Sequence, residues 1–295
     1  MDFVLHFAAF YHFGSDWLPE YQRTNMDGTS TVLQLAIENG ARRMIFASSL
    51  AAMLPPPKGE MLTERSPTSA VIPYGESKSA GERLILDASR QLPAMVLRIG
   101  GVFTDWCELP PLDSLIRPWV GGFPLNRIVA GHGNTAIPYI HRDDLVGLLR
   151  ACIDQSDRLG AHEVLLASQH GSVSHLELFD AIREALPKLE RVRPIFVSAT
   201  TATIGLTLKL SLGLITRNPP YERRWMLQYI DRPWIADTSY TRNILGWDCA
   251  QRKGILDRLP TMVDHYLHQR LLWNQRSRAR TSAKYLYTSD SDYQS

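Results

Sequence analysis

The chain has 295 residues, of which 44% are hydrophobic and 21% charged, and its formal net charge is +2. This is the composition of an ordinary globular protein, long enough for one large domain or two smaller ones. A charge balance so close to zero excludes the broadly basic surface of a nucleic-acid-binding protein, so we expect no nucleic-acid partner.

The cysteines and histidines of the chain indicate its cellular compartment and argue against some kinds of site. Cys107, Cys152 and Cys249 are odd in number and form no CxxC pair, so we expect reduced thiols and a cytoplasmic protein. The histidines form no His-x-x-x-His or His/Cys cluster, which argues against a metal site. No Gly-x-Ser-x-Gly sequence is present, which argues against a serine hydrolase.

The first hundred residues alternate between predicted strands and predicted helices. Apolar runs predict strands over residues 2–7, 43–48 and 94–99. One helical pattern ends at Gly40, and a second helix is predicted over residues 74–91. Alternation with connections of this length predicts an α/β fold, in which helices flank a parallel sheet.

Tyr74 and Lys78 stand four residues apart near the start of the second predicted helix. Positions i and i+4 share one helix face, so the two side chains should be neighbours. A phenol with a pKa near ~10 is a poor proton donor or acceptor at neutral pH. A lysine cation favours the phenolate, so we expect Lys78 to lower the pKa of Tyr74 by ~1–3 units, towards the range that acid–base catalysis needs.

Beyond residue 103 the pattern loosens, and we expect a smaller lobe of mixed α/β structure. Residues 131–136 read Gly-His-Gly-Asn-Thr-Ala, which fits the looser Gly-x-Gly-x-x-Ala form of a phosphate loop. That form must open a helix, whereas the strand-like residues 137–140 follow here. We therefore interpret residues 131–136 as a hairpin turn.

Two later segments have a distinct composition. Residues 199–215 are mostly apolar but include Lys209, and they are shorter than the ~20 apolar residues of a transmembrane helix. We favour a buried helix there over membrane contact. An amphipathic helix is predicted over residues 254–272, and no apolar pattern follows it, so we expect residues 273–295 to be disordered.

Five spaced pieces of the chain carry a family resemblance. They are residues 2–9, 25–29, 42–49, 73–78 and 95–103. In this order they resemble the extended short-chain dehydrogenase/reductase family, which includes the NAD-dependent epimerase/dehydratase group, over roughly residues 2–149. The resemblance implies a Rossmann-like sheet, NAD or NADP as cofactor, and a small-molecule substrate.

The resemblance also implies roles for individual residues. Ser49, Tyr74 and Lys78 would form the catalytic triad, and Asn25 would hold a water molecule beside the lysine. Lys78 would in addition hold the ribose hydroxyls of the cofactor. His6 would lie close to the cofactor, but a buried, hydrogen-bonded histidine with no functional role fits this position equally well. The cofactor-binding residues that the resemblance implies are His6, Ala8, Ala9, Ser48, Tyr74, Lys78, Gly100 and Val102.

The glycine-rich segment of the family pattern is not found before the first predicted strand. In the family, a strand, a glycine-rich turn and a helix hold the cofactor pyrophosphate, whereas here Met1 stands before what should be the fourth strand. We therefore expect a sheet truncated at its N-terminal half and weak cofactor binding, or else a start assigned at an internal methionine. The strand at residues 2–7 would then be an edge able to pair with another chain, so the sequence allows a homo-oligomer.

The expected organisation has three parts. Residues 1–170 should form the Rossmann-like core, with residues 101–130 partly in the substrate lobe. Residues 171–272 should build most of that lobe and the C-terminal helix, and residues 273–295 the disordered tail.

The expected function is that of an NAD(P)-dependent oxidoreductase acting on an alcohol or carbonyl of a small molecule. Ile137 stands where enzymes of nucleotide sugars usually carry an arginine that pairs with the diphosphate, which favours an apolar substrate. Arg217, Arg223 and Arg224 could supply phosphate contacts instead. A nucleotide-sugar epimerase or dehydratase, and a catalytically silent binding or regulatory relative, are the alternatives. The sequence does not decide between NAD and NADP.

Overall fold

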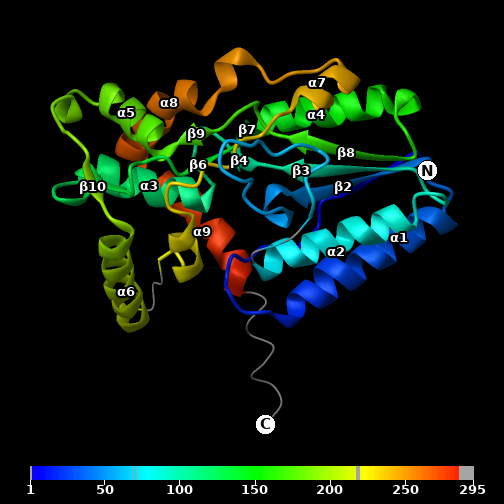
Figure 1. Ribbon diagram of the computed structural model, residues 1–295, viewed down its shortest axis with the longest axis horizontal. Helices are drawn as coiled ribbons and strands as arrows, with labels where there is room; N and C mark the ends of the chain where they lie inside the picture. The colour runs from blue at the N-terminus through cyan, green and yellow to red at the C-terminus, as the bar shows by residue number, and fades with distance from the viewer. Residues whose placement is uncertain (1, 69, 71, 217–219, 286–295) are drawn as a thin grey trace, which may run out of the picture. The chain divides into compact units, whose positions relative to one another are not determined.

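The computed structural model describes residues 2–68, 70, 72–216 and 220–285 (Figure 1). The chain divides into two compact units, and each unit combines segments that are far apart in the sequence. Unit 1 consists of Met1–Val102, Ala136–Ser172 and Arg232–Gln251. Unit 2 consists of Phe103–Thr135, Val173–Asp231 and Arg252–Ser295.

A four-stranded parallel sheet forms the centre of unit 1. Its order is β1-β2-β3-β8, and each strand pairs in parallel with the next. The predicted α/β fold with a Rossmann-like parallel sheet is confirmed, and the predicted strand ends agree to within one residue. The strands are β1 (Phe3–His6), β2 (Arg43–Ser49), β3 (Ala94–Ile99) and β8 (His162–Ala167).

Helices cover both faces of this sheet (Figure 1). One face carries α1 (Gly28–Glu38) and α2 (Pro73–Asp87), and the other carries α4 (Arg142–Asp154) and α7 (Ser239–Leu245). Short strands β4 (Gly101–Phe103) and β7 (Tyr139–His141) pair with each other, and β6 (Ala136–Ile137) is also short.

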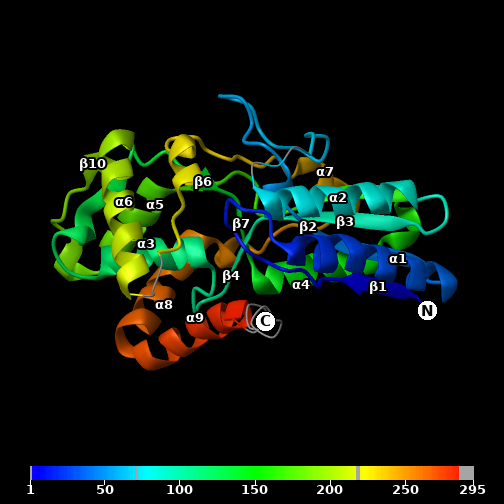
Figure 2. The ribbon, with the colours of Figure 1, turned by 90° about the horizontal axis from the view of Figure 1, so that it is seen from below.

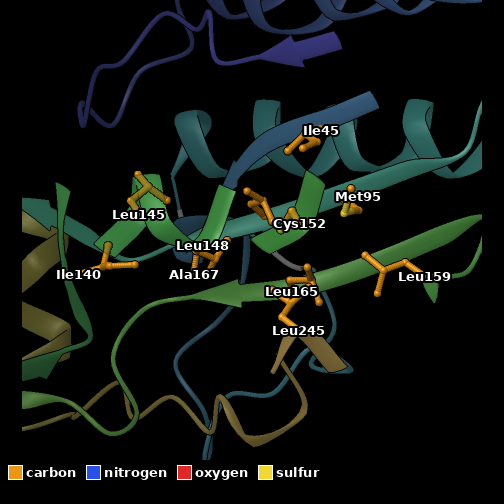
Figure 3. Packing of buried hydrophobic residues seen from close by; sticks show 11 residues of the cluster. Ile45, Met95, Ile140, Leu145, Leu148, Cys152, Leu159, Leu165, Ala167 and Leu245 are labelled. Carbon is orange, nitrogen blue, oxygen red and sulfur yellow. The ribbon is translucent and has the colours of Figure 1, made fainter. Parts of the chain in front are cut away.

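The apolar run of β2 serves both faces at once. Met44 and Phe46 belong to the cluster under α1 and α2. Ile45 points the other way, into the cluster with Leu148 of α4 and Leu245 of α7 (Figure 3). Successive strand residues face opposite sides, so a strand buried on both sides must be apolar throughout.

Two glycines let α2 lie close to β2 and the turn that follows it. A Cβ on Gly81 would stand 2.6 Å from the Phe46 ring, and one on Gly75 would stand 2.0 Å from the Ala51 carbonyl oxygen. Pro73 occupies the first turn of the helix, where its fixed φ suits the helix and no N–H is needed. This close fit determines where the side chains of α2 lie.

Unit 2 is mainly helical (Figure 2). Its short strands β5 (Ile128–Ala130) and β10 (Ile195–Val197) pair in parallel, and β9 (Val173–Ser174) precedes α5. Its helices are α3 (Pro110–Val120), α5 (His175–Ala185), α6 (Ala199–Thr216), α8 (Ile255–His268) and α9 (Arg270–Tyr285).

The hairpin predicted at residues 131–136 is wrong, because β5 pairs with β10 rather than with the strand that follows the turn. Gly131 and Gly133 do adopt positive φ, as a tight turn requires. The backbone N–H groups of His132 and Asn134 donate to the Asp231 carboxylate at 2.9 and 3.0 Å. The turn therefore binds a carboxylate of the same unit.

The predicted disorder from residue 273 is wrong for the described part of the tail, where α9 extends to Tyr285. Trp273 is fully buried, its ring meets Tyr266 edge-on at 5.3 Å, and its Nε1 donates to Asp113 at 2.8 Å. This buried tryptophan anchors a helix whose other residues are mostly polar. Residues 286–295 lie outside the described part of the chain.

Helix α6 is only half buried, so the prediction of a buried helix is wrong for one of its faces. Leu206 is buried, whereas Ile204, Leu208, Leu212 and Ile215 are exposed. None of the helices within the described residues is long and apolar enough to cross a membrane.

We expect Trp273→Ala to lower the free energy of unfolding by about 3–5 kcal/mol, because it leaves a large cavity and removes the hydrogen bond to Asp113 Oδ1. Leu271→Ala is the matched control, since Leu271 is 81% exposed on the same helix and should change stability by less than about 0.5 kcal/mol. Denaturant unfolding measures both. Equal effects of the two substitutions would contradict the docking of α9.

Candidate active site

The predicted site residues of unit 1 gather at one edge of the parallel sheet. Ser48 and Ser49 end β2, Gly100 follows β3, and Ala8 and Ala9 follow β1. Parallel strands bring their carboxyl ends to the same edge, where open α/β sheets bind their ligands. The fold therefore brings together residues that are nearly a hundred positions apart.

Ser49, Tyr74 and Lys78 form the centre of the site. Ser49 lies close enough to Tyr74 for its hydroxyl to act on the pKa of that side chain. Tyr74 and Lys78 lie one turn apart in α2, and both are buried. Lys78 Nζ lies 4.4 Å from the centre of the Phe46 ring and, within the described residues, makes no hydrogen bond or ion pair. The Ser49 hydroxyl at the end of β2 thus lies beside a phenol and a buried cation that share one stretch of α2.

The expected lowering of the Tyr74 pKa by Lys78 is wrong in this structure. Burial raises the pKa of Tyr74, the nearby Tyr11 phenol raises it further, and the hydrogen bond from Ser49 lowers it only in part. The physical reason is desolvation, which disfavours the phenolate in a site closed by aromatic rings. Tyr74 is therefore a neutral proton donor at neutral pH.

Burial favours the neutral form of Lys78, as it does for Tyr74. It lowers the pKa of Lys78 to about 8, and the Glu82 carboxylate, one turn further along α2, opposes this effect. The pKa of His6 is lowered too, first by burial and then by the Lys78 charge. Near neutral pH this site therefore combines a neutral imidazole with a lysine close to its titration midpoint.

Two aromatic side chains that the sequence did not single out close the site. The Tyr11 ring meets the Tyr74 ring edge-on at 5.1 Å, and the Phe13 ring lies 5.2 Å from it. Both belong to the loop after β1, where the run Phe-Tyr-His-Phe over residues 10–13 was the available signal. Their packing is a direct cause of the desolvation of Tyr74.

Asn25 ties this loop to α2. Its Oδ1 accepts from the Phe10 N–H at 2.6 Å, and its Nδ2 donates to the Phe10 carbonyl at 3.0 Å. Nδ2 also contacts Ser77 Oγ at 2.9 Å, next to Lys78 in the chain. Asn25 lies in a π-helix (Tyr21–Asp27), an element often found at functional sites. Its role in holding a water molecule remains a prediction.

His6 and Ser48 both have partners inside the protein. His6 is buried, and its Nε2 lies 2.9 Å from Thr29 Oγ1. The Ser48 hydroxyl donates to Glu82 Oε1. Their predicted contacts with a cofactor stay predictions, and the interactions observed here are structural.

The remaining predicted cofactor residues differ in setting. The Gly100 N–H donates to the Ala167 carbonyl at 3.0 Å, and a Cβ on Gly100 would stand 2.7 Å from the Pro138 carbonyl oxygen. Val102 packs against the core cluster of the α4 face. Ala8 is exposed and Ala9 half-buried in the loop after β1. Crowding against the Pro138 backbone thus explains why a glycine stands at position 100.

The prediction also missed a buried ion pair between Glu82 of α2 and Arg98 of β3, 2.9 Å apart. The available signals were an arginine inside an apolar strand and a glutamate four residues after Lys78. Within the described residues no group of three or more His, Cys, Asp or Glu side chains could hold a metal ion.

Residues 1–167, more than half of the chain, match the NAD dependent epimerase/dehydratase family. The parallel sheet and the Ser49, Tyr74 and Lys78 group described above lie within this range. The chain belongs to the NAD dependent epimerase/dehydratase family.

Curated relatives are similar over parts of their length. UDP-glucose 4-epimerase 1 of Oryza sativa subsp. japonica is 29% identical over 210 residues, which are 63% of this chain and 59% of that protein. UDP-glucose 4-epimerase of Streptomyces lividans is 41% identical over 86 residues, which are 28% of this chain and 26% of the relative. The chain thus spans less than two thirds of the length of these relatives.

Solved structures share the fold. MoeE5 in complex with UDP-glucose and NAD superposes with a TM-score of 0.63 at 22% identity, covering 94% of this chain and 80% of that one. UDP-glucuronic acid 4-epimerase from Bacillus cereus, in complex with UDP-glucuronic acid and NAD, gives a TM-score of 0.67 at 17% identity. That match covers 91% of this chain and 76% of the Bacillus cereus chain.

We expect Lys78→Met to raise the free energy of unfolding at pH 7 by about 1–3 kcal/mol, because it removes a buried charge. The pKa of Lys78 falls from an ordinary 10.5 to about 8 on folding, so between these values the unfolded chain binds more protons. The cost of the charge is therefore complete below about pH 8 and disappears as the pH approaches 10.5.

Denaturant unfolding at pH 6, 7 and 9.5 measures this effect, and the gain should shrink at the highest pH. Lys209→Met is the matched control, because Lys209 is exposed and pairs with Glu222. A gain that does not depend on pH, or one shared by the control, would contradict the buried charge.

Proposed function

We propose that this chain is part of an NAD-dependent enzyme that interconverts an alcohol and a carbonyl on a small molecule. The observation that carries the proposal is the close approach of Ser49 to the buried Tyr74 side chain, one turn from the buried cation of Lys78. The family match supports the cofactor, and so do the similar structures whose titles include NAD.

The described residues fit the ribose half of a nicotinamide dinucleotide. Lys78 has three N–H donors with no partner in the described chain, and they point to a ligand with several hydroxyl acceptors. The Gly131–Gly133 turn does not fit the pyrophosphate, because Asp231 fills it and a strand follows it. We therefore place only the ribose and nicotinamide end of the cofactor in unit 1.

Each residue of the group has one task in this proposal. Bound NAD would supply the hydride acceptor. Tyr74 Oη exchanges a proton with the substrate oxygen, Ser49 Oγ orients that oxygen, and the Lys78 cation holds hydroxyl groups. Tyr11 and Phe13 exclude water from the proton-transfer site.

A second candidate function is epimerisation or dehydration of a nucleotide sugar. It is favoured by the similarity to UDP-glucose 4-epimerases over part of the chain. Ile137 in β6 favours an apolar substrate instead, since it offers no charge to a diphosphate. We propose the apolar alcohol or ketone as the preferred substrate.

We also propose the cytoplasm as the site of action. Cys107, Cys152 and Cys249 are all free thiols, which suits a reducing compartment.

We expect Tyr74→Phe to lower kcat by about 10²-fold or more while the Kd for NAD stays within about threefold, because the hydroxyl serves only proton transfer. Turnover assays and calorimetric titration with NAD measure the two effects. Tyr240→Phe is the matched control, since Tyr240 is an exposed tyrosine of unit 1 that bonds Glu163.

Normal kcat in the Tyr74→Phe enzyme would show that another group transfers the proton. NAD binding by the wild-type chain without turnover of any substrate would favour the catalytically silent relative.

A substrate panel separates the two candidate functions. We expect oxidation of apolar secondary alcohols, or reduction of the matching ketones, at a kcat/KM at least about tenfold above any activity on UDP-glucose. Absorbance of the reduced cofactor reports the first reaction, and product analysis by mass spectrometry and NMR reports the second. Efficient epimerisation of UDP-glucose with no activity on alcohols would refute the preference drawn from Ile137.

A further inference from the structure

A buried ion pair holds α2 against the sheet. Arg98 Nη2 lies 2.9 Å from Glu82 Oε2, and Arg98 Nε lies 3.2 Å from both carboxylate oxygens. The side chains of Arg98 and Glu82 are only 6% and 8% exposed. Two buried charges are stable together only when their geometry is good and their remaining hydrogen-bonding groups are satisfied.

Those remaining groups are satisfied. Arg98 Nη1 donates to the Ser66 carbonyl at 2.8 Å and to the Glu64 carbonyl at 3.2 Å. Ser48, which is paired with Arg98 across the β2–β3 ladder, donates its hydroxyl to Glu82. Glu82 is thus held in one place by two strands at once.

The Glu82 carboxylate is connected to the catalytic group through both β2 and α2. Ser48 directly precedes Ser49 in β2, and Glu82 follows Lys78 by one turn of α2. Glu82 is the carboxylate whose charge acts on Lys78 and offsets part of its burial. The other ionisable groups around Lys78 are His6 of β1, whose neutral form burial favours, and Tyr74 of α2.

We propose that Glu82 is a positioning residue for the Ser49, Tyr74 and Lys78 group: Arg98 and Ser48 fix its carboxylate, which sets the place of α2 and keeps Lys78 cationic. This inference deepens the proposed function, because the charge of Lys78 is what that function uses.

The test follows the titration of Lys78 itself in the full chain. The chain is labelled with ¹⁵N-lysine, and the Lys78 signal is identified by its loss in Lys78→Arg. NMR spectra across pH 6–11 then give the midpoint at which Lys78 loses its proton, which should be near pH 8 in the wild type. The measurement needs neither cofactor nor turnover.

We expect Glu82→Gln to lower this midpoint by about one pH unit or more, since the substitution keeps the shape and removes only the charge. Glu82→Asp, which keeps the charge on a shorter side chain, should give a smaller lowering. Asp105→Asn is the matched control, because it removes the carboxylate of the Asp105–Arg258 pair in unit 2 and should leave Lys78 unchanged.

An unchanged midpoint in both Glu82 variants would overturn the inference, as would an equal shift in Asp105→Asn. If Glu82→Gln does not fold, the Glu82→Asp variant decides alone. A lowered midpoint together with normal kcat in Tyr74→Phe would leave the positioning role intact and refute the proposed function. Loss of kcat in Tyr74→Phe together with an unchanged midpoint in the Glu82 variants would refute the positioning role and leave the proposed function intact.

Discussion

The buried pairing of Glu82 with Arg98 is the interaction on which the arrangement of unit 1 most depends. It connects α2, β2, β3 and the chain around Glu64 to Ser66 through one set of hydrogen bonds. The glycines of α2 bring the same helix into close contact with β2. Since the ion pair is buried, loss of either partner would leave an uncompensated charge, which is far more costly than loss of a surface pair.

The second constraint is the removal of water from the catalytic group. Tyr11 and Phe13 cover Tyr74, and Phe46 lies under Lys78. In such surroundings the neutral form of each group is favoured, so the pKa of Tyr74 rises and that of Lys78 falls to about 8. A pair that sequence spacing predicts to be cation and phenolate is therefore a neutral phenol beside a lysine that titrates near pH 8.

Local pattern predicted most of unit 1 and less of unit 2. Apolar strands bounded by short connections give strong signals, and β2 and β3 were placed almost to the residue. The turn at Gly131 was predicted, but not the pairing of β5 with β10, because a strand partner 67 positions away leaves no local trace. The docking of α9 centres on the buried Trp273 within a polar stretch whose pattern predicts disorder, and Asn274 and Arg276 add polar contacts.

The sequence by itself determined the order of strands and helices, the family, and the grouping of Ser49, Tyr74 and Lys78, because each follows from spacing along the chain. Only the tertiary structure decided the protonation of that group and the partners of Asn25, His6 and Ser48. The physical reason is that pKa values and hydrogen bonds depend on burial and on neighbours from other strands and helices. Those neighbours are set by packing, which no single segment encodes.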